Sequence, residues 1–197
     1  MSSVDQSEAL TAARALFQHY PSSYWIAGGW ALDLFAGHVR RSHGDVDVLV
    51  LARDLDQLAT TFTTPRPSIQ DPETGNRRAW LPGEQLTPGP NALVFPDGLH
   101  PSPIQILFAA SEADQWIYHR GRGAIRKPLT EITLTSPTGL PYLAPEIVLL
   151  FKSRGPRPKD TADFTDVAHL LDPARRRWLL DRIAPLHPDH PWLPALS

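Results

Sequence analysis

A pair of glycines and a pair of aspartates constrain the fold of this sequence more than any other feature. Gly28 and Gly29 end one apolar run, and Asp45 and Asp47 open the next, which continues from Val46 to Leu51. Alternate residues of a strand point to the same face, so the two carboxylates are expected to lie side by side at one edge of a sheet. The pattern therefore predicts a strand, a glycine turn, a short helix and a second strand that begins with paired carboxylates.

The residue types at these positions indicate a site for phosphate and metal. Two adjacent like charges are unfavourable unless a cation lies between them. Carboxylate oxygens suit Mg²⁺, which uses one or two protein carboxylates together with substrate phosphates. Glycine lacks a Cβ atom, so the backbone at Gly28 and Gly29 can approach a phosphate closely. We predict a site for a metal-bound nucleoside triphosphate, with Asp45 and Asp47 as metal ligands. A plain strand edge and a turn without a ligand are the alternatives.

The arrangement resembles the nucleotidyltransferase superfamily, whose signature is a Gly-Gly or Gly-Ser turn, a helix and then Asp-x-Asp on a strand. More narrowly, it resembles the aminoglycoside 2''-adenylyltransferase-like family, which includes lincosamide nucleotidyltransferases. The likeness spans most of the chain. Its residues are Gly28 to Asp33, Gly37, Arg41, His43, Asp45 to Asp47, Gly139 to Glu146, Lys152, Pro158 to Asp160, Asp163 and His190 to Trp192.

This resemblance implies an enzyme that transfers a nucleoside monophosphate, AMP from ATP, to a hydroxyl group of an aminoglycoside-like or lincosamide-like acceptor. It also implies antibiotic resistance as the role, ATP as the donor, and Mg²⁺ held by Asp45 and Asp47, which are then catalytic. The metal would act as a template and charge clamp for in-line transfer. Two alternatives stay open. One is a transferase that acts on protein or RNA, and the other is a catalytically degenerate relative that binds nucleotide or a partner protein.

Further site candidates lie in the loop before the carboxylates and in the last third of the chain. Arg41 and His43 are expected to meet phosphate oxygens or to support the aspartates, with solvated loop residues as the alternative. Lys152 and Lys159 are candidates for binding the triphosphate, because an ammonium group neutralises phosphate charge. Surface lysines at helix termini are the alternative. Asp163 either caps its helix or accepts the proton of the acceptor hydroxyl, and we include it among the catalytic candidates.

Several conspicuous residues have simpler expected roles. Trp30 is expected to pack in the core, and Asp33 to cap or salt-bridge within its helix. Asp160 is expected to cap a helix at its positive end. His187 and His190 have a spacing that suggests a metal site, but neighbouring prolines break any helix that would align them. We therefore expect a structural loop there.

One position departs from the superfamily pattern. The superfamily usually supplies a third carboxylate from a later strand, and the best candidate strand here is 103–108, where Gln105 stands in the expected position. Glutamine offers a neutral oxygen, which weakens a second metal site and cannot act as a base. Other acidic residues of the middle region are candidates for the missing ligand: Glu84, Asp97, Glu112 and Asp114.

Hydrophobic periodicity predicts an α/β (α+β) fold, with a mixed β-sheet flanked by helices and a small helical C-terminal part. The resemblance implies that this sheet is of the nucleotidyltransferase type. The expected helices are 10–20, 31–35, 55–62, 145–151, 160–171 and 175–186, and the expected strands are 24–27, 46–51, 104–109, 116–119 and 132–134. Prolines between residues 65 and 103 favour turns and short strands. We divide the chain into a catalytic core, 1–140, and a helical subdomain, 141–197.

Composition narrows the setting. The chain has 197 residues and no cysteine, so disulfides and thiolate metal sites are excluded. We find no signal peptide and no apolar stretch long enough to span a membrane, which favours a cytoplasmic protein. The net charge of -2 gives no reason to expect nucleic acid as the partner. The expected partners are a nucleoside triphosphate and a small-molecule acceptor, and the resemblance is compatible with a homodimer.

Overall fold

The computed structural model describes residues 4–71, 74–81, 83–86, 92–119 and 123–197. Within these residues the strands form one ten-stranded sheet. The strands are β1 (Tyr24–Ile26), β2 (Val46–Leu51), β3 (Ser68–Gln70), β4 (Arg77–Ala79), β5 (Ala92–Val94), β6 (Ile104–Glu112), β7 (Gln115–Tyr118), β8 (Ile125–Pro128), β9 (Thr133–Thr135) and β10 (Pro141–Leu143). The helices are α1 (Glu8–Phe17), α2 (Gly28–Ala36), α3 (Leu55–Thr61), α4 (Leu129–Ile132), α5 (Pro145–Lys152), α6 (Pro158–Ala168), α7 (Pro173–Ile183) and α8 (Leu193–Leu196), with 3₁₀ turns η1 (Val4–Gln6) and η2 (Ala52–Asp54).

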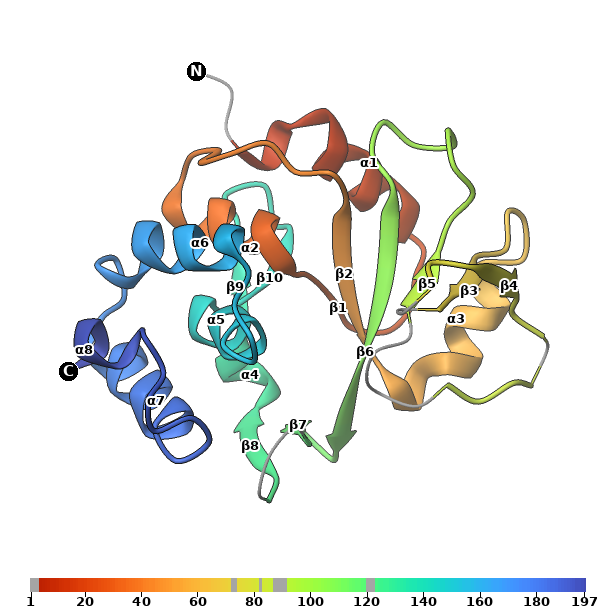
Figure 1. The fold of residues 1–197 in the computed structure, drawn as a ribbon. Helices are drawn as coiled ribbons and strands as arrows, with labels where there is room; N and C mark the ends of the chain where they lie inside the picture. The colour runs from red at the N-terminus through yellow and green to blue at the C-terminus, as the bar shows by residue number, and fades with distance from the viewer. Residues whose placement is uncertain (1–3, 72–73, 82, 87–91, 120–122) are drawn as a thin grey trace.

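The sheet is mixed, as predicted. Its strand order is β4-β3-β5-β6-β2-β1-β10-β9, while β7 pairs with β6 and β8. The central strand β2 runs antiparallel to β1 and parallel to β6, and β1 runs parallel to β10. Figure 1 shows β2 and the long strand β6 side by side in the middle of the molecule. The predicted α/β fold, a mixed sheet flanked by helices, is confirmed.

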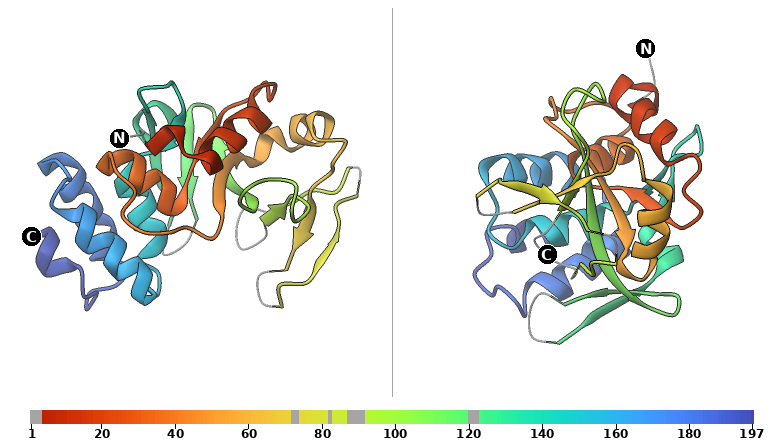
Figure 2. Two further views of the ribbon diagram at one scale, coloured as in Figure 1. Left: turned by 90° about the horizontal axis from the view of Figure 1, so that it is seen from above. Right: turned by 90° about the vertical axis from the view of Figure 1, so that its right-hand side faces the viewer.

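Helices from the two ends of the chain meet beside this sheet. Helix α2 contacts both α5 and α6, and α5 packs on α7, which in turn packs on α8. The views of Figure 2 place the C-terminal helices at one end of the molecule and the β3–β4 hairpin at the other. The chain segments near residues 30 and 160 therefore lie together although they are far apart in sequence.

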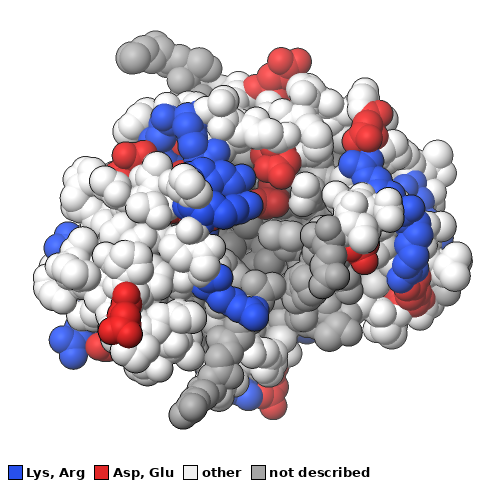
Figure 3. All heavy atoms as spheres, viewed as in Figure 1, with Lys and Arg blue, Asp and Glu red and all other residues white. Residues whose placement is uncertain are grey.

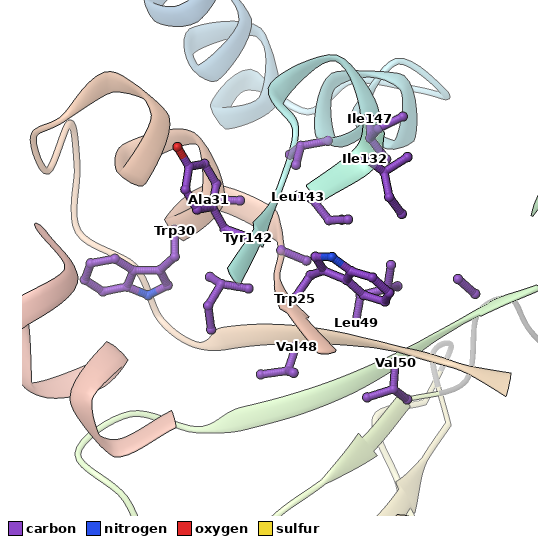
Figure 4. Packing of buried hydrophobic residues seen from close by; sticks show 14 of the residues in the cluster. Trp25, Trp30, Ala31, Val48, Leu49, Val50, Ile132, Tyr142, Leu143 and Ile147 are labelled. Carbon is purple, nitrogen blue, oxygen red and sulfur yellow. The ribbon is translucent and has the colours of Figure 1, made fainter. Parts of the chain in front are cut away.

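The core lies where β1, β2 and β10 meet the helices. Figure 4 shows Trp25 of β1 next to Leu49 of β2 and Leu143 of β10. The indole N–H of Trp25 donates a hydrogen bond to Thr133 Oγ1 at 2.7 Å, which satisfies this buried donor. Every residue of β2 except Asp47 is buried. A strand covered on both faces reads as a continuous apolar run, so the single acidic interruption marks a position kept for another purpose.

Most of the predicted elements are confirmed. Strand β2 has the predicted bounds, and α5, α6 and α7 replace the predicted helices with shifts of a few residues at their ends. Gly37 ends α2 in the left-handed conformation with φ 78°, as expected of a helix C-cap. The proline-rich middle region contains the short strands β3 and β5.

Some predictions need correction. Helix α2 begins at Gly28 rather than at Ala31, so the glycine turn is the first turn of the helix. The segment 132–134 is the end of α4 and most of β9. Strands β8 and β10 were not predicted. Because β10 pairs with β1 and β9, the first three residues of the predicted helical subdomain, 141–143, belong to the sheet. The division into a core and a helical subdomain otherwise stays a prediction.

No helix in the described ranges is both long enough and apolar enough to cross a bilayer.

Candidate functional site

The two aspartates lie at the start of the central strand. Asp45 precedes β2 and Asp47 is its second residue. Their main chain is held by α2: the Ala27 N–H donates to the Asp47 carbonyl at 2.8 Å, and Trp30 Nε1 donates to the Asp45 carbonyl at 3.1 Å. Trp30 itself is buried in the core, in line with its predicted packing role. The backbone around the carboxylates is therefore fixed from both sides of the glycine turn.

The electrostatics of the pair favour a bound cation. Burial, together with the charge of Asp45, raises the pKa of Asp47 to about 6, although nearby basic side chains oppose the shift. The anionic form of Asp47 is thus destabilised when no cation is present, and a bound divalent ion would stabilise it. Two adjacent carboxylates are the donor set that one Mg²⁺ takes from a protein when phosphates supply other ligands. Among the described residues, no cluster of three or more His, Cys, Asp or Glu side chains has the geometry to hold a metal.

Gly28 and Gly29 owe their identity to close contacts. Gly28 has φ 61°, and a Cβ atom there would overlap the Asp47 carboxylate. A Cβ atom at Gly29 would lie 2.5 Å from the His43 ring and 2.7 Å from Arg41 Nη2. Any larger residue would push the aspartate or the loop side chains out of place. The structure therefore brings the predicted turn, the predicted metal ligand and both predicted loop residues together.

Gln105 occupies the position predicted for a third carboxylate. It is the in-register partner of Asp47 across the parallel pair β2–β6, so both side chains lie on the same face of the sheet. Its Nε2 donates to Asp45 Oδ2 at 3.1 Å. Two of the alternative candidates are paired elsewhere: Glu84 with Arg78 at 2.5 Å and Asp97 with Arg77 at 2.9 Å.

The remaining alternatives lie on the β6–β7 hairpin. Glu112 is paired with Arg126 at 2.6 Å. Asp114 is in the turn that follows, where its carbonyl accepts the Leu129 N–H at 2.8 Å. Neither residue lines the cavity that contains Asp47.

Helix α6 brings Asp163 into contact with basic residues from two other elements. Arg41 donates to it with two nearly parallel bonds, Nε to Oδ1 at 2.9 Å and Nη2 to Oδ2 at 3.0 Å. Lys152 Nζ lies 3.0 Å from its Oδ2 and Arg40 Nη2 lies 3.2 Å from its Oδ1. The Asp163 side chain has no exposed surface. Burial alone would raise the pKa of Asp163, but the hydrogen bond from Arg41 and the charge of Lys152 outweigh it and lower the pKa to about 2.

These contacts argue against the predicted role of Asp163 as a proton acceptor. A buried carboxylate with a lowered pKa and three cationic partners is a poor base near neutral pH. The geometry instead favours a positioning role, in which Asp163 holds Arg41 and Lys152. The alternative of a simple helix cap also does not fit, since its oxygens bond side chains from outside α6.

Sequence reasoning missed Arg40 and undervalued Asp33. Both side chains are buried, and Arg40 Nε donates to Asp33 Oδ1 at 2.7 Å. The other carboxylate oxygen of Asp33 bonds His43 Nε2 at 2.6 Å, and the His43 ring packs against Trp30 with centroids 4.5 Å apart. An acidic residue four positions before Gly37 on an apolar helix face was the available signal. We call Asp33, Arg40, Arg41, Lys152 and Asp163 the buried charge cluster.

The first turn of α6 adds more positive charge. Asp160 caps this helix by accepting the Arg157 N–H at 3.1 Å, as predicted, and it also binds Lys152 Nζ at 2.6 Å. The charges of Lys152, Lys159 and Arg157 all lower the pKa of Asp47. Lys159 is exposed on this turn, so it is available to a ligand.

A cavity of about 420 Å³ opens beside Asp47. The charged residues of its lining are Asp47, Asp160, Lys152, Arg154 and Arg157. Apolar and aromatic residues also line it, among them Leu49, Leu107, Trp116, Tyr118 and Phe151. Such a cavity, mostly apolar with a few convergent charged groups, is typical of a small-molecule site. Its charged lining thus combines two carboxylates with several cations.

The C-terminal histidines are structural. His190 is buried and its Nε2 bonds the Ser153 carbonyl oxygen at 2.8 Å. Trp192 stacks on Phe164 with ring centroids 4.4 Å apart. These contacts hold the segment after α7 against the end of α5 and against α6, which agrees with the predicted structural loop.

Comparison with known proteins points to one group of enzymes. The sequence model of the aminoglycoside-2''-adenylyltransferase family matches residues 9–68, the segment that contains the glycine turn and both aspartates. A lincosamide resistance protein of Staphylococcus haemolyticus is 42% identical over 33 residues, which are 17% of this chain. The match spans about a fifth of the length of that relative, 20%.

Two solved structures share the fold. The lincomycin-bound lincosamide antibiotic adenylyltransferase LnuA superposes with a TM-score of 0.58 at 18% identity, covering 84% of this chain and 98% of its own. The enzyme ANT(2")-Ia, in complex with adenylyl-2"-tobramycin, gives a TM-score of 0.57 at 14% identity, covering 86% and 91% of the two chains. The predicted resemblance to the aminoglycoside and lincosamide nucleotidyltransferases is confirmed, by sequence over residues 9–68 and by fold over most of the chain.

Proposed function

We propose that this chain, which has the fold of antibiotic adenylyltransferases and the sequence signature of the aminoglycoside 2''-adenylyltransferase family, is itself a nucleotidyltransferase. It would transfer AMP from ATP, with Mg²⁺, to a hydroxyl group of an aminoglycoside-like or lincosamide-like acceptor. The likeness to proteins that act on these antibiotics supports the acceptor class. A homodimer stays a prediction from the resemblance, and a cytoplasmic location stays a prediction from the sequence composition.

One observation carries the proposal. A single cavity joins Asp47 and Gly28 to Lys152 and Arg157. The carboxylates suit a divalent cation, and the basic side chains suit the phosphates of the same ligand. The aromatic part of the cavity adds a wall for a flat ring, and the indole N–H of Trp116 there has no hydrogen-bond partner among the described residues. A nucleoside triphosphate combines a bound divalent cation, a chain of phosphates and a flat base, and these are the three features that such a cavity would bind.

The proposed division of work follows from the contacts. Asp45 and Asp47 would hold the Mg²⁺, which when bound would supply charge neutralisation and orientation to the reacting phosphate. Gly28 and Gly29, at the positive N-terminus of α2, would receive phosphate oxygens together with Lys152 and Lys159.

The loop residues would act mainly by position. Asp163 would orient Arg41 toward the phosphates, because their two-bond contact fixes the guanidinium plane. His43 would hold the glycine turn through its contacts with Asp33 and Trp30.

A second candidate function rests on Gln105. Because it replaces a carboxylate with an amide, a chain that binds nucleotide without transferring it is the main alternative. In that case nucleotide binding would persist and no acceptor would be modified.

Transfer of label from α-³²P ATP to lincomycin or tobramycin, in the presence of MgCl₂, tests the proposal directly. We expect labelled antibiotic with the native chain. The Asp45→Asn/Asp47→Asn double variant should lose at least about 10³-fold in rate, since metal charge stabilisation contributes several kcal/mol. Calorimetric titration with a non-hydrolysable ATP analogue separates the alternatives. Nucleotide binding without transfer to any acceptor supports the second candidate function, and absence of both binding and transfer contradicts the nucleotide site.

A further inference from the structure

We propose, building on the proposed function, that Gln105 restricts this site to a single divalent cation and that one substitution at this position would admit a second. The starting point is the geometry of the pair β2–β6. Gln105 is in register with Asp47, and its amide reaches Asp45 on the same face. The side chain thus stands at the only in-register β6 position beside the carboxylates.

The amide orientation is set by chemistry. An ionised aspartate only accepts hydrogen bonds, so the Gln105 group that faces Asp45 Oδ2 at 3.1 Å is the NH₂ donor. A lone pair of Asp45 Oδ2 therefore accepts this hydrogen bond and is not free to bind a cation. A cation and an N–H group compete for the same carboxylate lone pairs, so the amide stands where a second cation would need an anionic ligand.

Charge leads to the same conclusion. The aspartate pair supplies two negative charges, which match one divalent ion. The cavity beside Asp47 is also lined by Lys152, Arg154 and Arg157, whose positive charges outnumber the one negative charge that Asp160 adds. Two divalent ions placed about 3.5–4 Å apart, as in two-metal sites, would need further anionic ligands. Among the described residues no third carboxylate joins the pair.

The neighbours of Gln105 leave room for an acidic replacement. Ile104 and Ile106, on either side of it, are buried on the opposite face, so a change at 105 need not disturb them. Glutamate has the same length as glutamine and differs in offering two acceptor oxygens with a full charge. Gln105→Glu would therefore convert a donor to Asp45 into a third anionic ligand, and Gln105→Asp offers the same charge on a shorter side chain.

The test counts Mn²⁺ ions by electron paramagnetic resonance. Each protein is mixed in equimolar amounts with an ATP analogue that has a methylene group between the α- and β-phosphates, and is then titrated with Mn²⁺. The Asp45→Asn/Asp47→Asn variant provides the background from the analogue itself. We expect one site-bound Mn²⁺ in the native chain, and two in Gln105→Glu or Gln105→Asp with a spectrum broadened by the neighbouring ion. Gln57→Glu, which adds the same side chain on the exposed face of α3, should still bind one.

The outcomes separate this inference from the proposed function. Two Mn²⁺ ions in the native chain, both lost in the double aspartate variant, would overturn the inference and leave the nucleotide site standing. A count of one in both acidic variants, with thermal unfolding unchanged, would also overturn it. Equal Mn²⁺ binding in the native and double-variant chains would overturn both, because the aspartates would then hold no metal.

Discussion

The buried charge cluster and the outer β3–β4 hairpin both contain ion pairs, but the two regions differ in how far these pairs are exposed to solvent. The Arg40 and Asp163 side chains of the cluster are 3% and 0% exposed. Arg77 of the hairpin and its partner Asp97, which follows β5, are 33% and 72% exposed. In Figure 3, basic side chains gather in two places on the same face, beside α6 and along the hairpin. Groups of basic side chains that look alike on the surface can thus have different structural roles.

The difference shows which of the two regions is fixed by buried charges. An exposed pair is screened by water and contributes about 0–1 kcal/mol, while removal of one member of a buried pair costs about 3–5 kcal/mol. Lys152 of the cluster lines the cavity beside Asp47, so the buried ion pairs hold one basic side chain of the proposed phosphate end in place. No residue of β3 or β4 lines that cavity, and the hairpin is held by exposed, weak ion pairs.

Replacement of Asp163 should have the largest effect. Asp163→Asn leaves Arg40, Arg41 and Lys152 without their shared anion, so we expect the free energy of unfolding to fall by about 3–5 kcal/mol in urea titrations. Asp166→Asn, on the same helix, is the matched control: this residue is 51% exposed and 3.7 Å from Arg40. A loss below about 1 kcal/mol in Asp163→Asn would remove the contrast between the two regions.

Acid should act on the cluster through the same residue. The pKa of Asp163 is lowered to about 2 in the folded chain, against an ordinary value of 3.8, so the folded state binds this proton less readily than the unfolded state. Its contribution to stability is complete above about pH 4 and is lost as the pH falls toward 2. Unfolding midpoints measured between pH 4 and pH 2 should drop more steeply for the native chain than for Asp163→Asn. Parallel curves would contradict the assignment.

Two glycines distinguish backbone strain from site geometry. Gly28→Ala and Gly37→Ala both place a side chain at positive φ, 61° and 78°, and each should cost about 1–2 kcal/mol of stability. Only the new methyl group at 28 meets Asp47, since nothing lies within 4 Å of a Cβ at 37. We therefore expect Mn²⁺ affinity to fall at least about tenfold in Gly28→Ala alone, measured by calorimetry. Equal affinities would mean that Asp47 moves aside freely.

The smallest effect is expected at the hairpin. Asp97→Asn removes the partner of Arg77, and because Asp97 is largely exposed the unfolding free energy should change by less than about 1 kcal/mol. Any change should disappear at 1 M NaCl, where exposed charges are screened within about 3 Å. A larger change, or one that resists salt, would indicate that this region is as tightly built as the cluster.

Local sequence signals predicted the elements that they control. The apolar run 46–51 gave β2 its bounds, and Gly37 marked the end of α2. Strand β10 was missed because three residues beginning with a proline show no alternation, and it is the partner β1 that makes it a strand. Strand β8 contains Arg126 and Lys127, and the burial of Lys127 against Glu146 is a tertiary contact that periodicity does not contain.

The site divides in the same way. The sequence spacing predicted that Asp45 and Asp47 lie near the glycine turn, because one short helix separates them in the sequence. The role of Arg40 was not readable, because its partner Asp163 lies on another helix. The chemistry of Asp163 was equally hidden: a carboxylate is a base, a cap or an anchor according to the cations around it.

The contact between Arg40 and Asp163 closes a separation of 123 residues along the chain. During synthesis the glycine turn and the aspartate pair leave the ribosome long before residue 163 does. Until then Arg40 and Arg41 have no anchor on α6, and the aspartates lack their basic neighbours from residues 152–159. The proposed site is therefore completed late in folding. The glycine turn and the aspartate pair form from nearby residues, whereas the basic side chains join them only through contacts between residues far apart in the sequence.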